Sequence, residues 1–487
     1  MRKNILSPAA LDVLSRTGHP TLYIAKSMRS AAPRMFFRPP PMSRLRRLAI
    51  QVLLLLACQG LLAGESAQPP ASALVARMRD NAQAITNKVS DYDRLLASIG
   101  DASIVLLGEA THGSAEFYDE RARITQRLIN EKGFRALVLE AGWAPATRLD
   151  DFVQGRLRGA DATTALRVFQ HFPRWVWRNE QFAGFLEYLK ESQEDSPPTS
   201  PAISVYGMDL YGVPEAIDQV LRYLTTYDPA AVRQARRDYR CFAPYSRPPL
   251  DPQLYGRDVA NGSMPSCERS VQSRLKKMRK LVGADPAPAA FAALMSARTI
   301  AGAEAYYRTL YALGSRDSWN LRERFLAESL RILLERHGKI VVWAHNTHQG
   351  DARATDQVLA GELSIGQLMR EQMGEEAVYL VGITTFSGSV RAATGWTTPD
   401  RVKTLRPAIE GSWSRLLHDV GLPAFVLVFR GNADLIDALD RQQLDRDIGV
   451  NYLPDAELEK HYWHSSPAKR FDALIHIDTT RALLPLP

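Results

Sequence analysis

The sequence has little cysteine, and its cysteines form no recognised motif. Among 487 residues there are three, Cys58, Cys241 and Cys267, and there is no CxxC pair. A cysteine-rich metal site is therefore excluded. Cys241 and Cys267 are close in the chain and could form a disulfide bond if the protein is exported, while a pair of free thiols is the alternative.

Motifs for covalent catalysis and for nucleic-acid binding are also absent. The chain has no GxSxG motif and no catalytic cysteine motif, so a covalent serine or cysteine mechanism has no support. The net charge of +8 would suit nucleic acid, but the basic residues are scattered and the first 47 residues carry much of the excess. Because no zinc finger or aromatic-interleaved basic run is present, we predict no nucleic-acid partner.

No apolar run in the leader is long enough to span a membrane. Residues 43–47 are basic, residues 48–57 are apolar, and small residues at 61–64 offer a cleavage position, which is typical of a secretory signal. We predict a signal peptide over 42–64 and a non-native upstream extension over 1–41. The protein is then exported, to the periplasm. Residues 55–58 also resemble a lipobox, so a lipid anchor at Cys58 is an alternative.

The rest of the chain is predicted to form one α/β domain. Residues 65–72 are a linker and residues 73–487 the domain. Apolar runs predict strands at 104–107, 135–139, 203–208, 339–344, 377–385, 424–429 and 473–477, and helices at 73–98, 114–130, 150–168 and 179–191. We expect a mostly parallel central sheet flanked by helices. Residues 213–334 are mostly helical and predict an insertion, or lid, over the cleft at the carboxyl ends of the strands.

Polar side chains gather where four of these strands end. They are Glu109 with His112, Glu140, Asp209, and His345 with His348. Parallel strands bring their carboxyl ends to one edge of a sheet, where open α/β folds place their ligand sites. The sequence therefore predicts a site at this edge.

Two arginines interrupt apolar helix faces and point to the same edge. Arg121 falls between Phe117 and Ile124 on the core-facing stripe of helix 114–130. A buried guanidinium needs a carboxylate, and Glu109 and Glu140 are the nearest candidates. Arg322 repeats this pattern at the mouth of a later stripe, although a solvated arginine would explain it equally well.

Two chemistries fit these residues. One is a metal site, for which His112, His345, His348 and Glu109 would be the ligands. The other is metal-free hydrolysis, in which a neutral histidine accepts a proton from water, a carboxylate holds its other ring nitrogen, and an arginine or second histidine stabilises the oxyanion. A small-molecule binding protein without catalysis is a third possibility.

The ordered motifs resemble the erythromycin esterase family from about residue 73 to the C-terminus. The matching text is GEATHG at 108–113, Glu116-Phe117 with Arg121, Gly133-Phe134 leading to Glu140, AGW at 141–143, GMD at 207–209, AHNTH at 344–348 and GIT at 382–384. The resemblance implies an α/β hydrolase with a deep cleft and a helical excursion. It also implies hydrolysis of an ester or macrolide lactone, and hence a role in antibiotic resistance.

The resemblance also implies roles for the site residues. His112 would be the general base that activates water, with no metal and no cofactor required. Glu109 and Glu140 would orient it or balance its charge, and Arg121 would fix these carboxylates. His345 and His348 would complete the site, with Asp209 and Arg322 as further members. The expected partner is a small-molecule ester or lactone.

Overall fold

The computed structural model describes residues 70–487, apart from 196, 198, 200, 247–250, 284 and 286. The predicted extension, the signal peptide, Cys58 and most of the predicted linker lie outside the described residues. No helix in the described part is both long enough and apolar enough to cross a membrane.

A mostly parallel sheet of nine strands forms the centre of the described chain. Its order is β1-β8-β11-β6-β2-β5-β3-β4, with β7 paired to β6. The strands from β11 to β4 are parallel, whereas β8 is antiparallel to β11, β1 to β8, and β7 to β6. A separate hairpin-like pair joins β9 and β10. The strands are β1 (Gln83–Ala84), β2 (Ile104–Leu107), β3 (Ala136–Gly142), β4 (Ser204–Asp209), β5 (Ile340–Trp343), β6 (Val378–Ala392), β7 (Arg401–Leu405), β8 (Ala424–Val428), β9 (Gln443–Arg446), β10 (Tyr462–Ser465) and β11 (Ala473–Thr480).

Helices cover both faces of this sheet, as a parallel sheet requires. They are α3 (Ala71–Asn81), α4 (Asp93–Ile99), α5 (Ala115–Lys132), α6 (Trp143–Val153), α7 (Ala162–Leu166), α8 (Glu180–Glu194), α9 (Val213–Tyr227), α10 (Val232–Asp238), α11 (Gln253–Ala260), α12 (Glu268–Val282), α13 (Pro288–Ala312), α14 (Ser315–His337), α15 (Asn346–Gln349), α16 (Gln357–Ala360), α17 (Ile365–Met373), α18 (Trp413–His418), α19 (Ala433–Leu439), α20 (Glu457–His461) and α21 (Pro467–Arg470). Successive strand residues serve opposite faces: Leu106 belongs to the core under α14 and α17, and Leu107 to the core under α5 and α8.

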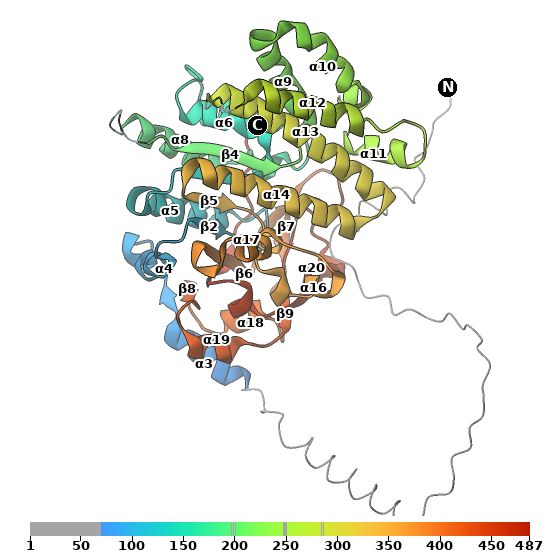
Figure 1. The fold of residues 1–487 in the computed structure, drawn as a ribbon. Helices are drawn as coiled ribbons and strands as arrows, with labels where there is room; N and C mark the ends of the chain where they lie inside the picture. Colours follow the sequence, from blue (N-terminus) through green and yellow to red (C-terminus); the bar gives the residue numbers. More distant parts are fainter. Residues whose placement is uncertain are drawn as a thin grey trace, which may run out of the picture.

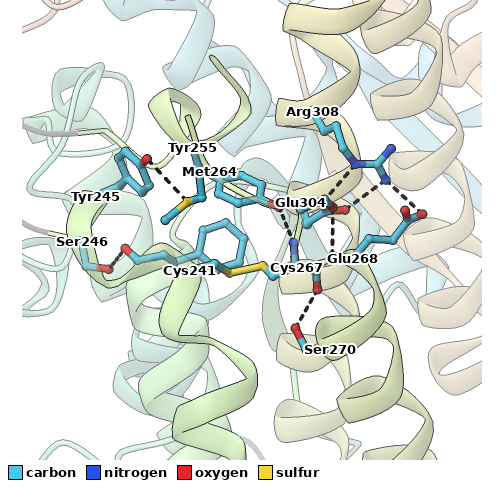
Figure 2. The surroundings of a disulfide bond; sticks show 12 residues. Cys241, Tyr245, Ser246, Tyr255, Met264, Cys267, Glu268, Ser270, Glu304 and Arg308 are labelled. Carbon is cyan, nitrogen blue, oxygen red and sulfur yellow. Dashed lines mark hydrogen bonds and ion pairs between the residues drawn. A yellow bond between two sulfur atoms is a disulfide. The ribbon is translucent and has the colours of Figure 1, made fainter. Parts of the chain in front are cut away.

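The expected helical insertion is present as α9 to α13, whereas α14, which was expected to belong to it, packs on the sheet. Figure 1 shows α9, α10, α12 and α13 (green to yellow) stacked beyond β4. Within it, Cys241 and Cys267 form a disulfide bond. Tyr255, drawn beside the bond in Figure 2, accepts a hydrogen bond from the Cys267 N–H and donates one to the buried carboxylate of Glu304, both at 2.9 Å. The disulfide closes the loop-rich part of the insertion, and Tyr255 ties that part to α13.

Some expected boundaries were wrong. The stretch 73–98 is two helices separated by the short edge strand β1, and 150–168 is the end of α6, a loop and α7. The short strands β1, β7, β9 and β10 were not expected, because their burial patterns are not the continuous apolar runs of the central strands. The His345–His348 segment was expected on a loop, but residues 346–349 form the short helix α15.

Candidate active site

The predicted residues converge at the carboxyl ends of β2, β3, β4 and β5. β5 lies between β2 and β3, so the strands that carry Glu109 and Glu140 are not neighbours, contrary to expectation. Instead, α15 at the end of β5 joins them. The backbone N–H of Asn346 donates to the carbonyl of Glu109 (2.9 Å), and that of His345 donates to Oε2 of Glu140 (2.9 Å).

The loop from 108 to 114, called the base loop here, is tightly enclosed. The glycine at 113 lies against the backbone of Arg391 on β6, and a Cβ there would overlap its carbonyl. The carbonyl of Gly113 accepts hydrogen bonds from the N–H groups of Arg391 (3.1 Å) and Leu483 (3.0 Å). A residue larger than glycine would push these chains apart, which explains why the motif ends in glycine.

Within the base loop, His112 is held by Glu109. Its Nδ1 lies 2.7 Å from Oε1 of that carboxylate. The other carboxylate oxygen, Oε2, lies 2.8 Å from Nη2 of Arg121, in an ion pair whose atoms are not aligned for a hydrogen bond. A proton on Nδ1 therefore points at the carboxylate, which leaves Nε2 as the basic nitrogen. In the described part of the chain no group is hydrogen-bonded to Nε2, and His112, 9% exposed, lines a cavity.

Arg121 is fully buried at 0% exposure. Its guanidinium carbon lies 4.3 Å from the centre of the Tyr118 ring and 4.7 Å from that of Trp343. The aromatic faces and the Glu109 carboxylate together balance a cation that would otherwise be very costly to bury. The sequence-based prediction that Arg121 needs one of two carboxylates is confirmed for Glu109 and wrong for Glu140.

Glu140 belongs to a second cluster, organised by Arg322 on α14. Arg322 donates from Nη2 to Oε1 of Glu140 (3.0 Å), and it holds Asp209 with Nε (3.0 Å) and Nη2 (2.5 Å). Burial would raise the pKa of Glu140, but His348 above all, then His112 and Arg322, hold it well below its usual range. Glu140 is therefore a carboxylate in the buried site, and Arg322 is a member of the site rather than a solvated arginine.

His348 lies between two carboxylates. Its Nδ1 is 2.6 Å from Oε1 of Glu323, and its Nε2 is 3.1 Å from Oε1 of Glu140. Burial alone would lower the pKa of His348, but Glu140 and Glu323 outweigh burial and raise it to about 9. The ring is thus a cation at neutral pH, although Nη1 of Arg322 also lies 3.1 Å from Nε2. Glu140 bridges these two positive groups.

His345 has the opposite character. Its Nε2 donates to the carbonyl of Ile448 (3.1 Å), and its Nδ1 is 2.9 Å from the hydroxyl of Thr347. Burial, with the nearby His112, lowers the pKa of His345 to about 4, so the ring is neutral. Its centre lies 4.8 Å from that of His112. With both nitrogens engaged, His345 is arranged to pack against His112 and not to exchange protons.

One cavity of about 340 Å³ is lined by the side chains at the centre of the two clusters: His112, Glu140, Asp209, Arg322, His345 and His348. Helical-insertion residues such as Tyr306 and Leu310 form part of its wall. Phe172 and Trp396, from loops far apart in the chain, meet edge to face at 5.1 Å, and both line the cavity. The site therefore combines buried charges with an aromatic lining, as small-molecule sites do.

The sequence-based prediction missed one member of the site, and it named Asp209 and Arg322 only as further members. Glu323 was not expected, although it lies on an apolar stripe of α14 with Ala327, Leu330 and Leu334. A carboxylate on a core stripe calls for a buried partner just as Arg121 does, so this signal was present.

Among the described residues no group of three His, Cys, Asp or Glu side chains is arranged to hold a metal ion.

The chain is similar to proteins of known family and structure. The family model for erythromycin esterase matches residues 129–480. YbfO from Bacillus subtilis (strain 168), whose name classes it provisionally as a hydrolase, is 22% identical over 345 residues, which cover 67% of this chain and 74% of YbfO.

Three solved structures share the fold. A succinoglycan biosynthesis protein matches with a TM-score of 0.71 at 20% identity, over 87% of this chain and 100% of that one. A protein from Bacillus cereus matches with a TM-score of 0.72 at 20% identity, over 86% and 99%. A mutant of the erythromycin esterase EreC, in its open conformation, matches with a TM-score of 0.61 at 15% identity, over 81% and 95%.

The family match spans most of the chain, and it includes β3, β4, α14 and β5, which supply much of the site. On this evidence the chain belongs to the erythromycin esterase family, a family of hydrolases.

Proposed function

We propose that this protein hydrolyses a carboxylic ester or lactone with a water molecule activated by His112. The proposal rests on the different surroundings of three predicted site histidines, His112, His345 and His348. Of these three, His348 is a cation between carboxylates and His345 has both nitrogens engaged, so His112 is the one that presents a basic nitrogen to the cavity. Glu109 holds its other nitrogen, which is the arrangement that a general base requires. His171 and His461 also line the cavity, but His171 pairs with a partly exposed carboxylate and Nε2 of His461 already accepts a backbone hydrogen bond.

The chemical step follows from these positions. Nε2 of His112 takes a proton from water while the water oxygen forms a bond to the carbonyl carbon. The Glu109 carboxylate stabilises the resulting imidazolium through Nδ1. The tetrahedral intermediate then breaks its bond to the alcohol oxygen, and His112 returns the proton to that leaving group. Arg322 and His348, both cationic and lining the cavity, supply positive charge for the oxyanion.

The surroundings of the candidate metal ligands do not favour the metal-dependent alternative. A metal ligand must offer a free lone pair, but in His345 and His348 the ring nitrogens are already bonded to neighbouring groups. Arg322 also occupies the space between Glu140 and Asp209 with a positive charge of its own.

The size of the cavity limits the substrate. At about 340 Å³ it is at the small end of the range for ligand sites, roughly 300–1,000 Å³. We therefore propose that a small ester is enclosed whole, whereas a macrolide would insert only its lactone edge and leave the rest of its ring outside the cavity. Resistance to macrolides is the consequence if such a lactone is opened.

The test is turnover of erythromycin and a panel of small esters and lactones by the purified protein. Mass spectrometry detects the addition of one water, and metal content is measured on the same sample. His112→Ala should abolish turnover, and the control His464→Ala, an exposed histidine outside the cavity, should not. Loss of turnover on chelation, with one metal bound per chain, would instead favour the metal-dependent reaction. Ligand binding without turnover would indicate a binding protein.

We also propose that the protein is exported. The Cys241–Cys267 disulfide supports this, because such bonds persist in oxidising compartments. N-terminal sequencing of the protein recovered from the periplasm should find a start within or just after residues 61–64, and recovery with a lipid on Cys58 would identify a lipoprotein. A native N-terminus before Met42 would contradict the upstream-extension prediction for 1–41.

A further inference from the structure

A second polar feature of the cavity is the segment 447–451, called the acceptor loop here. Asp447 and Asn451, at its two ends, both line the cavity. The loop lies beside the base loop: the N–H of Ile448 donates to the carbonyl of Ala110 (2.7 Å), and its carbonyl accepts from Nε2 of His345 (3.1 Å). Its position is thus fixed relative to the proposed base.

Asp447 uses only one of its two carboxylate oxygens within the protein. Oδ2 accepts hydrogen bonds from Nη2 of Arg470 (2.8 Å) and Nε1 of Trp463 (2.9 Å). Oδ1 is buried, and among the described residues it has no hydrogen-bond partner. The residue is only 3% exposed. A buried carboxylate oxygen is costly unless a donor reaches it, and because Asp447 lines the cavity, a ligand bound there is the candidate donor.

Asp447 shares its arginine with a second carboxylate. Arg470 also holds Asp445 through Nη1, at 2.8 Å. One guanidinium therefore serves two buried carboxylates, and burial together with this crowding raises the pKa of Asp445. Arg470 is thus shared between two carboxylates and reaches only Oδ2 of Asp447, which leaves Oδ1 as an acceptor for a ligand donor.

Asn451 adds a second acceptor on the same loop. Its Oδ1 is buried, and in the described part of the chain it too lacks a hydrogen-bond partner. Two acceptor oxygens that line one wall are complementary to a ligand that carries donors. A ligand without donors would leave both oxygens unpaired, which is costly.

We propose that the acceptor loop is a subsite that binds a hydrogen-bond donor of the substrate, a hydroxyl or a protonated amine, near its ester group. This assigns a substrate class to the site and rests on the proposed hydrolysis. The enzyme should then prefer hydroxylated or amino-bearing esters to ethers and plain acyl esters of the same size.

The substitution Asp447→Asn tests this in a specific way. Arg470 and Trp463 are both donors, so the carbonyl oxygen of the new amide must face them, and its NH₂ group must face the cavity. The variant thereby replaces an acceptor with a donor at nearly constant volume. Asn451→Leu removes the second acceptor without touching Arg470, and it serves if Asp447→Asn does not fold.

The experiment uses p-nitrophenyl hexanoates that carry a hydroxyl, an ammonium or a methoxy group at carbons 3 to 6. The methoxy compounds are the matched controls, because they keep the bulk and the oxygen but cannot donate. The corresponding 4-nitroanilides are titrated by calorimetry, so that binding is measured whether or not the esters are cleaved. Comparison of the hydroxyl and ammonium series shows which donor the loop takes.

We expect wild type to favour a donor compound over its methoxy counterpart by about 10- to 100-fold in kcat/KM or in affinity, at one position at least. Asp447→Asn should remove that preference and leave the methoxy compounds within about threefold of wild type, and Asn451→Leu should weaken it. Ester cleavage without any preference for donor compounds, or a preference that survives both variants, would overturn the proposed subsite. Either result would leave the proposed hydrolase function standing. A preference among the anilides without ester cleavage would support the subsite and count against the hydrolase.

Discussion

The imidazole rings of His112 and His345 lie 4.8 Å apart, yet they are held in opposite ways. The backbone carbonyl of Ile448 and the hydroxyl of Thr347 occupy both nitrogens of His345. A carboxylate occupies one nitrogen of His112 and the cavity receives the other. His345 is thus a structural residue, whereas the adjacent His112 is a candidate base. Substitutions should separate these two roles.

The first prediction contrasts these histidines. His112→Ala should lower kcat by about 10²- to 10⁴-fold, the usual contribution of a general base. Both His112→Ala and His345→Ala should cost about 1–3 kcal/mol of stability, because the first leaves Oε1 of the buried Glu109 unpaired and the second leaves groups at Ile448 and Thr347 unpaired. Chemical denaturation and steady-state kinetics on both variants check this. A loss of kcat in folded His345→Ala as large as that in His112→Ala would contradict the assignment.

The second prediction concerns the buried cation behind the base. Arg121→Met leaves the Glu109 carboxylate without its guanidinium, and breaking a buried pair costs about 3–5 kcal/mol. Arg324→Met, at an exposed position of α14, is the control and should stay within about 0.5 kcal/mol of wild type. Urea unfolding measures both, and similar midpoints for the two variants would show that Arg121 is not needed to hold Glu109.

The third prediction is a pH dependence. The pKa of His348 is raised to about 9, above its ordinary value near 6.5, so its protonated form stabilises the fold. This contribution is fully present below about pH 6.5 and is lost as pH rises through about 9. Glu323→Gln should lower the pKa of His348, as followed by NMR of labelled histidine, and should flatten the stability profile in this window. Glu335→Gln, exposed on the same helix, should leave both unchanged.

The fourth prediction concerns the disulfide of the insertion. Its cysteines are 26 residues apart, and a closed loop of that length contributes about 3 kcal/mol in the chain-entropy account. Replacing both Cys241 and Cys267 by serine should therefore destabilise the insertion by a similar amount. Denaturation of wild type with and without reductant should reproduce the difference. A reductant effect that persists in the double variant would show that the disulfide is not its cause.

The sequence predicted the site better than it predicted the edges of the fold. Buried strands are continuous apolar runs, so β2, β5 and the polar residues that follow them could be recognised from the sequence. The sequence did not show which carboxylate each arginine would pair with, because that pairing depends on the order of the strands in the sheet. β5 lies between β2 and β3, and this directs Arg121 to Glu109 and Glu140 to Arg322.

The acceptor loop was beyond sequence reasoning for a different reason. Asp447 and Asn451 lie more than three hundred residues from His112 and carry no motif of their own. Their significance comes from what the fold leaves unpaired around them. A single sequence shows which residues are polar, but the fold decides which of them are left without a partner.

The hydrogen bond from Leu483 to Gly113 has a consequence for biosynthesis. The base loop, made early in translation, receives support from residues 481–483: Arg481 accepts from the N–H of Ala115 (2.8 Å), and Leu483 donates to Gly113. A nascent chain therefore carries its base for most of synthesis without the contacts that position it. Maturation of the site should wait until residues 481–483 are made, and a chain that stops at Thr480 should fold its sheet and yet lack the proposed hydrolase activity.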